Sequence, residues 1–237
     1  MANDVNALAV GVKAQANAVN ASAIGVNAMA NDVNAQAFGV DSLANAANAV
    51  AIGVKSRSEA TNAIAIGSTA NSTKANSVAV GTLATADGVN ATAIGTDAGA
   101  TAVNTTAIGP GSRASSANAI GIGYKANSID VNSIAIGSCS NAVGHNSIAI
   151  GADANANGVN SFAAGYNARA NGGNTTAVGL NALANGFNAQ AFGRDSVANG
   201  VDSFAGGVNA SAFGTNSFAF GRCLLYTSDA ADDEERG

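Results

Sequence analysis

The chain has 237 residues, of which 29 are Gly, one is Pro, none is Trp and only 11% are charged. Its net charge of −5 argues against nucleic-acid binding, which needs clustered Lys and Arg, and it offers no polybasic segment for a membrane surface. No apolar run reaches the roughly 18 residues of a transmembrane helix, so we expect no membrane contact by this segment.

A period of fourteen residues governs the chain from its start. Every fourteenth residue from Gly11 to Gly221 is Gly, without an insertion or deletion. We call these residues the phased glycines. The same step from Asn6 to Asn216 meets Asn at every stop except Asp202. Strict internal repetition of this kind indicates a repeat architecture rather than an ordinary globular domain.

Each period is predicted to hold two short strands and two turns. In residues 137–150, apolar and polar residues alternate over 146–150, and a second strand begins over 140–142. Gly137 and Gly144 lie between these strands, where turns need a permissive backbone. Fourteen residues are too few for a helical repeat, which needs roughly thirty. We therefore predict an all-β fold, a parallel β-solenoid or β-roll of about fifteen coils over residues 1–221. The predicted turn glycines include Gly25, Gly53, Gly67, Gly95, Gly109, Gly137 and Gly151.

The later coils and the tail depart from this pattern in two ways. Asn-Gly pairs, which are strong turn signals, occupy the second turn at 157–158, 171–172, 185–186 and 199–200.

After Arg222 the period breaks, and residues 223–233, CLLYTSDAADD, resemble the translation of a sequencing adapter. We predict that 222–237 is a non-repeat tail, an adapter-derived artefact rather than a native acidic tail, and exclude it from the fold.

Four columns of small residues are predicted to fill the interior. They stand three, five, ten and twelve residues after each phased Gly, and every member is Ala, Ser or Thr apart from Gly121. Alternate residues of a strand face opposite sides, so the remaining strand residues point outward. Such small side chains fit two strands packed back to back in a narrow roll, where larger ones would force the sheets apart.

The residue before each phased Gly then lies on the outer surface and is mostly Ile, Val or Phe. A continuous apolar stripe of this length exceeds what monomers usually expose. We predict that it is buried between copies of the chain related by cyclic symmetry; the alternative is an inverted assignment in which Ile fills an ordinary core. The predicted interface residues are Ile24, Ile52, Ile66, Ile94, Ile108, Ile136 and Ile150.

The Asn column has two interpretations. Stacked Asn side chains can bond to turn backbone and to the coils above and below, which is the favoured, structural interpretation. The same ladder would also present a row of amides to an extended ligand such as collagen. Its members include Asn62, Asn76, Asn90, Asn104, Asn132 and Asn146.

The repeated Asn-Ser-Ile-Ala-Ile-Gly of residues 132–137 and 146–151 resembles the head repeat of YadA-like trimeric autotransporter adhesins. The resemblance covers residues 3–221. It implies a left-handed parallel β-roll and a homotrimer at the bacterial cell surface, with this segment extracellular. It also implies that the chain is an excerpt, since the family adds a signal peptide, neck, stalk and outer-membrane anchor. Family heads bind extracellular-matrix proteins or host cells, and similar repeats occur in phage fibres.

The residues predict no catalytic, cofactor-binding or metal site, and hence no enzyme. The single histidine, His145, and Cys139 both stand at turn positions without partners at ligand spacing. The leading hypothesis is therefore an adhesin head, with a passive spacer or phage fibre segment as the alternative. Ice binding is less favoured because it would want an outward Thr column, whereas Gln36, Val50 and Phe162 show no such regularity.

Overall fold

The computed structural model describes residues 1–221 and 225–226, and these residues contain strands but no helix. The chain divides into two compact units, Met1–Lys125 and Ala126–Gly237. In each unit the odd-numbered strands form one parallel sheet and the even-numbered strands another. A coil is a fourteen-residue period that carries one strand of each sheet.

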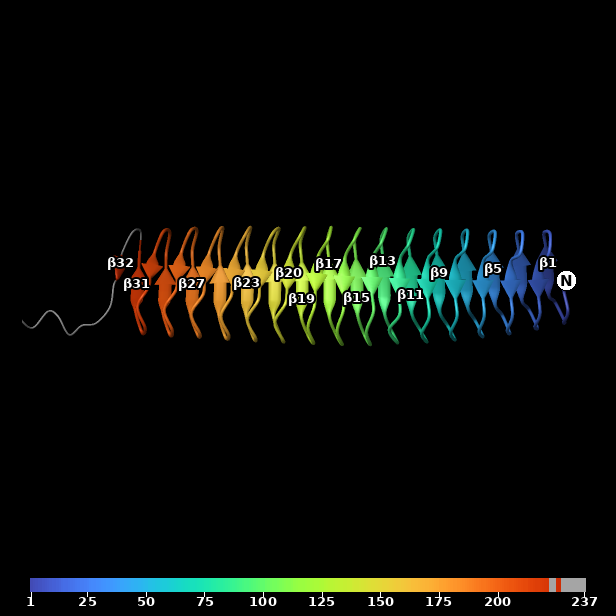
Figure 1. Ribbon diagram of the computed structural model, residues 1–237, viewed down its shortest axis with the longest axis horizontal. Helices are drawn as coiled ribbons and strands as arrows, with labels where there is room; N and C mark the ends of the chain where they lie inside the picture. The colour runs from blue at the N-terminus through green and yellow to red at the C-terminus, as the bar shows by residue number, and fades with distance from the viewer. Residues whose placement is uncertain (222–224, 227–237) are drawn as a thin grey trace, which may run out of the picture. The chain divides into compact units, whose positions relative to one another are not determined.

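The first unit alternates three-residue odd strands with two-residue even strands (Figure 1, blue to green). Its odd strands are β1 (Leu8–Val10), β3 (Ser22–Ile24), β5 (Gln36–Phe38), β7 (Val50–Ile52), β9 (Ile64–Ile66), β11 (Val78–Val80), β13 (Thr92–Ile94), β15 (Thr106–Ile108) and β17 (Ile120–Ile122). Its even strands are β2 (Gln15–Ala16), β4 (Met29–Ala30), β6 (Leu43–Ala44), β8 (Arg57–Ser58), β10 (Asn71–Ser72), β12 (Thr85–Ala86), β14 (Gly99–Ala100) and β16 (Arg113–Ala114).

The second unit repeats the arrangement. Its even strands are β18 (Asn127–Ser128), β20 (Asn141–Ala142), β22 (Asn155–Ala156), β24 (Arg169–Ala170), β26 (Leu183–Ala184), β28 (Val197–Ala198), β30 (Ser211–Ala212) and β32 (Leu225–Tyr226). Its odd strands are β19 (Ile134–Ile136), β21 (Ile148–Ile150), β23 (Phe162–Ala164), β25 (Thr176–Val178), β27 (Gln190–Phe192), β29 (Phe204–Gly206) and β31 (Phe218–Phe220).

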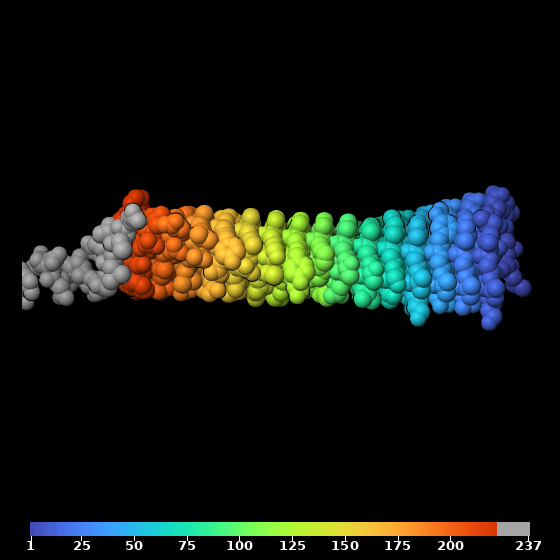
Figure 2. Space-filling view, turned by 90° about the horizontal axis from the view of Figure 1, so that it is seen from above, coloured from blue at the N-terminus to red at the C-terminus, as the bar shows by residue number. Residues whose placement is uncertain are grey.

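The pairing register places each residue beside its equivalent in the next coil. Ile134 pairs with Ile148 and Asn141 with Asn155, each fourteen residues on. In the space-filling view the coils of residues 1–125 appear as regular ridges (Figure 2). The predicted parallel β-solenoid is therefore confirmed. The predicted tail lies outside the described residues except for β32, in which Leu225 pairs with Ser211 of β30 in the same fourteen-residue register.

Both turns of a coil use the same backbone device, a left-handed residue in the third position. The Ser140 N–H donates to the Gly137 carbonyl at 3.4 Å across a turn whose third residue, Cys139, has φ 55°. The Ser147 N–H donates to the Gly144 carbonyl at 3.1 Å, with Asn146 at φ 54°. Asn146 is thus a turn residue, and the strand predicted over 146–150 is shorter, beginning at Ile148. The prediction was too long because alternation alone does not reveal a positive φ.

The glycines of the two turns are needed for different reasons. Gly137 has φ 132°, a conformation that side-chain-bearing residues rarely adopt, and a Cβ there would lie 2.4 Å from the Gly151 carbonyl oxygen. Gly144 has no positive φ, so the expected need for a permissive backbone is wrong at this position. A Cβ on Gly144 would instead lie 2.1 Å from the Gly158 carbonyl oxygen, so that here glycine allows close approach of successive coils.

The core consists of the predicted small columns. Ala135, Ala142 and Ala149 have no exposed surface, and Ser133, Ser140 and Ser147 are buried with them. The interior assignment is therefore confirmed, and the inverted alternative, with Ile as core, is wrong. Alanine carries little side-chain entropy to lose on burial, which suits a core only two short strands thick.

Most buried hydroxyl groups in these columns bond to the chain itself, whereas those of Ser112, Ser147 and Ser161 have no partner among the described residues. The Ser140 hydroxyl donates to the Gly137 carbonyl at 3.0 Å, and the Ser56 hydroxyl donates to the Gly53 carbonyl at the same distance. A buried hydroxyl without a partner costs about 1–3 kcal/mol. Ser and Thr are therefore tolerated in the column next to each turn, where a carbonyl lies within reach of the side chain.

Candidate binding surfaces

The outward side of the odd strands forms a continuous apolar surface within each unit, which we call the odd-strand face. The isoleucines predicted as interface residues each have between 36% and 40% of their surface exposed. They stack in register, as Ile52 pairs with Ile66, Ile94 with Ile108, and Ile136 with Ile150. Branched side chains in register make a flat ridge rather than scattered contacts.

The odd-strand face becomes aromatic toward the end of the second unit. The rings of Phe204 and Phe218 stack with centroids 4.6 Å apart, and Phe220 lies 6.0 Å from Phe218. Gly206 occupies the position that the other coils give to Ile, Val or Phe, apart from Ala164. A Cβ on Gly206 would lie 2.6 Å from the Phe204 ring. The exception in the column therefore makes room for the ring of its neighbour.

The Asn column forms the expected ladder of side-chain hydrogen bonds. The amide nitrogen of one Asn donates to the amide oxygen one coil on, at 3.1 Å from Asn62 to Asn76, 3.2 Å from Asn76 to Asn90, and 3.0 Å from Asn132 to Asn146. All of these residues have φ between 54° and 59°. Asn therefore serves twice, because it tolerates the left-handed turn conformation and ties coil to coil.

A further Asn ladder was missed by the sequence prediction. It stands six residues after the phased Gly, directly after each even strand and in the same connection as the first Asn column. Asn157 donates to Asn171 at 2.9 Å, and Asn171 donates to Asn185 at 2.7 Å. In the first unit Asn17 donates to Asn31 at 2.8 Å. The signal was available in the sequence as recurring Asn at this phase, but Glu, Thr and Ile in the middle coils interrupt it.

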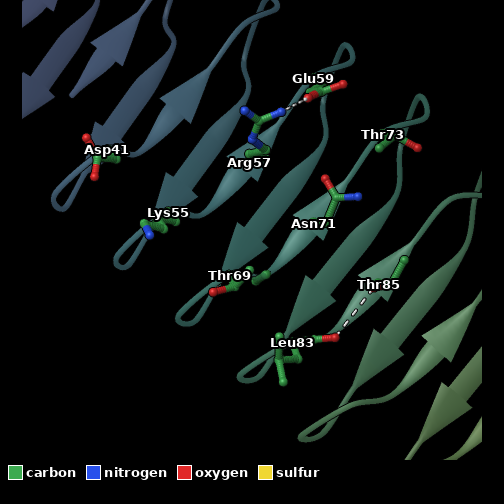
Figure 3. A pocket seen from close by; sticks show the side chains of 10 residues that line it. Asp41, Lys55, Arg57, Glu59, Thr69, Asn71, Thr73, Leu83 and Thr85 are labelled. Carbon is green, nitrogen blue, oxygen red and sulfur yellow. Dashed lines mark hydrogen bonds and ion pairs between the residues drawn. The ribbon is translucent and has the colours of Figure 1, made fainter. Parts of the chain in front are cut away.

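The outward side of the even strands is a shallow polar depression in each unit, which we call the even-strand trough. Its floor is the single outward residue of each even strand, and its walls are turn side chains two and six residues after the phased Gly. Figure 3 shows this arrangement in the first unit, with Arg57 and Asn71 between the two rows of turn residues. Arg57 pairs with Glu59 at 3.3 Å across floor and wall. The trough was not predicted, because it depends on which turn side chains flank a two-residue strand.

Reactive groups do not converge in the described part of the chain. The Nδ1 atom of His145 lies 3.9 Å from Oδ1 of Asp130, and both side chains are nearly half exposed. The Cys139 thiol is free and exposed. Residues 1–221 and 225–226 include no cluster of three potential metal ligands. Nor do they include a helix with the length and hydropathy of a membrane span.

The stacked fourteen-residue coils, small core and apolar outer ridge define the chain as a β-solenoid repeat protein. The family model for the YadA head domain repeat matches residues 2–28, 30–56, 58–84, 86–112, 114–140, 142–168, 156–182, 177–203 and 198–222. The chain belongs to the YadA head-repeat family. The resemblance seen in the sequence is therefore confirmed, and it carries an adhesin-type function.

Comparison with solved structures and curated proteins adds little. One similar structure is the collagen-binding domain of the Yersinia adhesin YadA, at 18% identity and a TM-score of 0.25. The alignment covers 97% of this chain and 88% of the other. A likeness this distant carries no argument about ligands. The comparison with curated proteins finds no significant match.

Proposed function

We propose that this chain is an extracellular head segment of a bacterial surface adhesin, in which three copies pack through their odd-strand faces and attach to extracellular matrix or host cells. In this proposal the chain catalyses no reaction, and a longer parent protein anchors it to the outer membrane. The observation that carries the proposal is the ridge of exposed isoleucines, since Ile24, Ile94 and Ile150 each have about 40% of their surface in contact with solvent.

The area argument favours burial of this ridge. Full burial of an isoleucine side chain stabilises by about 1.5–3 kcal/mol. Because these side chains are already partly buried, covering their exposed surface in a trimer would contribute roughly a third of that free energy per residue. Summed over the coils, the remaining gain is comparable to the typical net stability of about 5–15 kcal/mol. Ordering and association costs offset part of it. Apolar patches beyond a few hundred Å² usually mark interaction sites, and a cyclic arrangement of three copies would cover all three ridges.

Trimer packing would leave the even-strand trough and the Asn ladders on the outside. Both surfaces are polar, and the floor of the trough varies from coil to coil, as at Arg57, Asn71 and Thr85. Variation on the outside with a uniform interior is what a binding scaffold requires. Catalysis would instead require convergent titratable groups.

A binding assay of a trimerised chain tests the proposal. The chain is fused to a trimeric coiled coil and applied to surfaces coated with collagen, fibronectin or laminin, and to cultured host cells. Saturable binding to at least one surface is expected, with the coiled coil alone as the control. Binding to none of them would favour the alternative of a passive spacer or phage fibre segment.

A further inference from the structure

The even-strand trough of the second unit differs from its counterpart in the first unit in the chemistry of its lining. It has a volume of about 660 Å³, within the range of ligand pockets. Asn141, Asn155 and Arg169 form the floor. Asn157 and Asn171 form one wall, and Asp153 and Asn167 lie on the other beside the exposed ring of Tyr166. Amides therefore dominate this trough, whereas acidic, basic, hydroxyl and aliphatic side chains share the one in Figure 3.

The walls are held in place before any ligand arrives. Asn157 donates to Asn171 at 2.9 Å on one side, and Asn167 donates to Asn181 at 3.0 Å on the other. A ladder bond uses one of the two amide hydrogens and one of the two lone pairs of each Asn. The second hydrogen and lone pair remain for a ligand. Pre-ordered side chains lose little conformational entropy on binding.

The floor contains an unfulfilled polar atom. Asn127 donates to Asn141 at 3.1 Å, which continues the ladder pattern. The next bond of this ladder, from Asn141 to Asn155, is missing, because the buried Asn155 Oδ1 has no hydrogen-bond partner among the described residues. A buried acceptor without a partner costs about 1–3 kcal/mol. Rotation of the Asn155 amide toward a ligand hydroxyl would supply the missing donor.

The lining disfavours the other common classes of ligand. A peptide cannot add a strand here, since β20, β22 and β24 are each paired on both sides. A strongly charged polymer finds only one acidic and one basic side chain, Asp153 and Arg169. An apolar ligand finds little to bury against, because the lining is otherwise mostly amide.

We propose that the even-strand trough of the second unit binds a neutral oligosaccharide chain along the stack of coils. Each sugar hydroxyl both donates and accepts, which matches the free donor and acceptor of each ladder amide. The Tyr166 ring, which is 58% exposed, offers an apolar face against which the C–H face of a sugar ring can pack. The amides recur once per coil, about 4.8 Å apart, close to the length of one sugar unit in an extended chain. This site is separate from the odd-strand face and does not depend on binding of matrix proteins.

Isothermal titration of the full chain tests the proposal. The probes are hexasaccharides of β-1,4-linked glucose, β-1,4-linked N-acetylglucosamine and α-1,4-linked glucose, with a heparin hexasaccharide and a collagen-like triple-helical peptide as the charged and protein arms. We expect at least one neutral hexasaccharide to bind. Tyr166→Ala should weaken that binding about three- to tenfold. Tyr166→Phe, which keeps the ring, should stay within about twofold.

The matched control is Tyr124→Ala. Tyr124 occupies the same position of its coil, directly after a phased Gly, and is 51% exposed, but it does not line this trough. Tyr124→Ala should leave the affinity unchanged, and Asn155→Leu, which removes the floor amide, should weaken it. The proposal is overturned if no neutral hexasaccharide binds, if only the heparin or collagen-like probe binds, or if Tyr124→Ala and Tyr166→Ala weaken binding equally.

Discussion

The two outer faces of the second unit differ completely although they share one interior. The odd-strand face over β19 and β21 carries Ile136 and Ile150, while the even-strand trough over β20 and β22 carries Asn141 and Asn155. Behind both faces lie the same columns of buried Ala and Ser. The fold therefore depends on the interior and the turns, and each exterior face can change without the other. Interior and turn substitutions should damage both faces, whereas exterior substitutions should affect only one.

The largest effect is expected from an interior substitution. Ala135→Leu places a bulky side chain at a position with no exposed surface, between sheets that cannot separate without disrupting neighbouring coils. We expect a loss of about 3 kcal/mol or more, or failure to fold. Asn141→Leu, on the outer side of the adjacent even strand, should cost less than about 1 kcal/mol. Thermal melts followed by circular dichroism measure both, and equal tolerance would contradict the inner and outer assignment.

A phased turn glycine should be almost as sensitive. Gly137→Ala adds a Cβ 2.4 Å from the Gly151 carbonyl oxygen and forces a side chain onto φ 132°, which together should cost about 2–3 kcal/mol. The control is Gly111→Asn, because Gly111 has φ 67° and equivalent positions carry Asn27 and Asn167. Gly111→Asn should leave urea stability unchanged or raise it. If the control is as harmful as Gly137→Ala, the distinction between the two kinds of turn glycine fails.

A ladder asparagine should matter less. Asn76→Ala removes bonds to Asn62 and Asn90 at an exposed turn and places Ala at φ 59°, at a cost of about 1–2 kcal/mol. Asn76→Gly removes the same bonds but relieves the backbone. We therefore expect Asn76→Gly to lose less than half as much stability by chemical denaturation. Equal losses would show that the amide ladder, rather than the left-handed turn, is the main reason for Asn in this column.

The smallest effect is expected at the end of the chain. Deletion of residues 223–237 should change the melting temperature by less than about 2 °C, because the Gly period ends at Gly221. In the described part of this region, residues 225–226, the two-residue strand β32 pairs with β30. A clear fall in melting temperature would mean that β32 caps the last coil. The prediction of an artefactual tail would then be wrong.

The fourteen-residue period allowed most of the coil to be predicted. The Gly column and the small columns dictated parallel stacking, the buried Ala residues and the outward isoleucines, since only one phase places every small residue inside. Strand limits were harder, because Asn146 looks like a strand residue in an alternating pattern but adopts a left-handed turn. The role of Gly144 was also hidden, since close approach between coils is a three-dimensional property.

The outer surface was less predictable than the interior. Its residues follow the fourteen-residue period less strictly. Which of them lie side by side depends on how the turns before and after each even strand are placed in space. Asn157 and Asn155 are two residues apart in sequence, yet one forms a wall and the other a floor of the same trough.

Sedimentation analysis tests the central claim, that the odd-strand face is an interface between three copies. The chain fused to a trimeric coiled coil should sediment as a soluble trimer, with a melting temperature well above that of the unfused chain. Combined replacement of Ile94, Ile108, Ile136 and Ile150 by Ser should abolish that gain while leaving the monomer folded and more soluble, since all four side chains are at least 36% exposed. Sedimentation of the unfused, unmutated chain as a stable monomer, with no thermal gain on fusion, would contradict the claim.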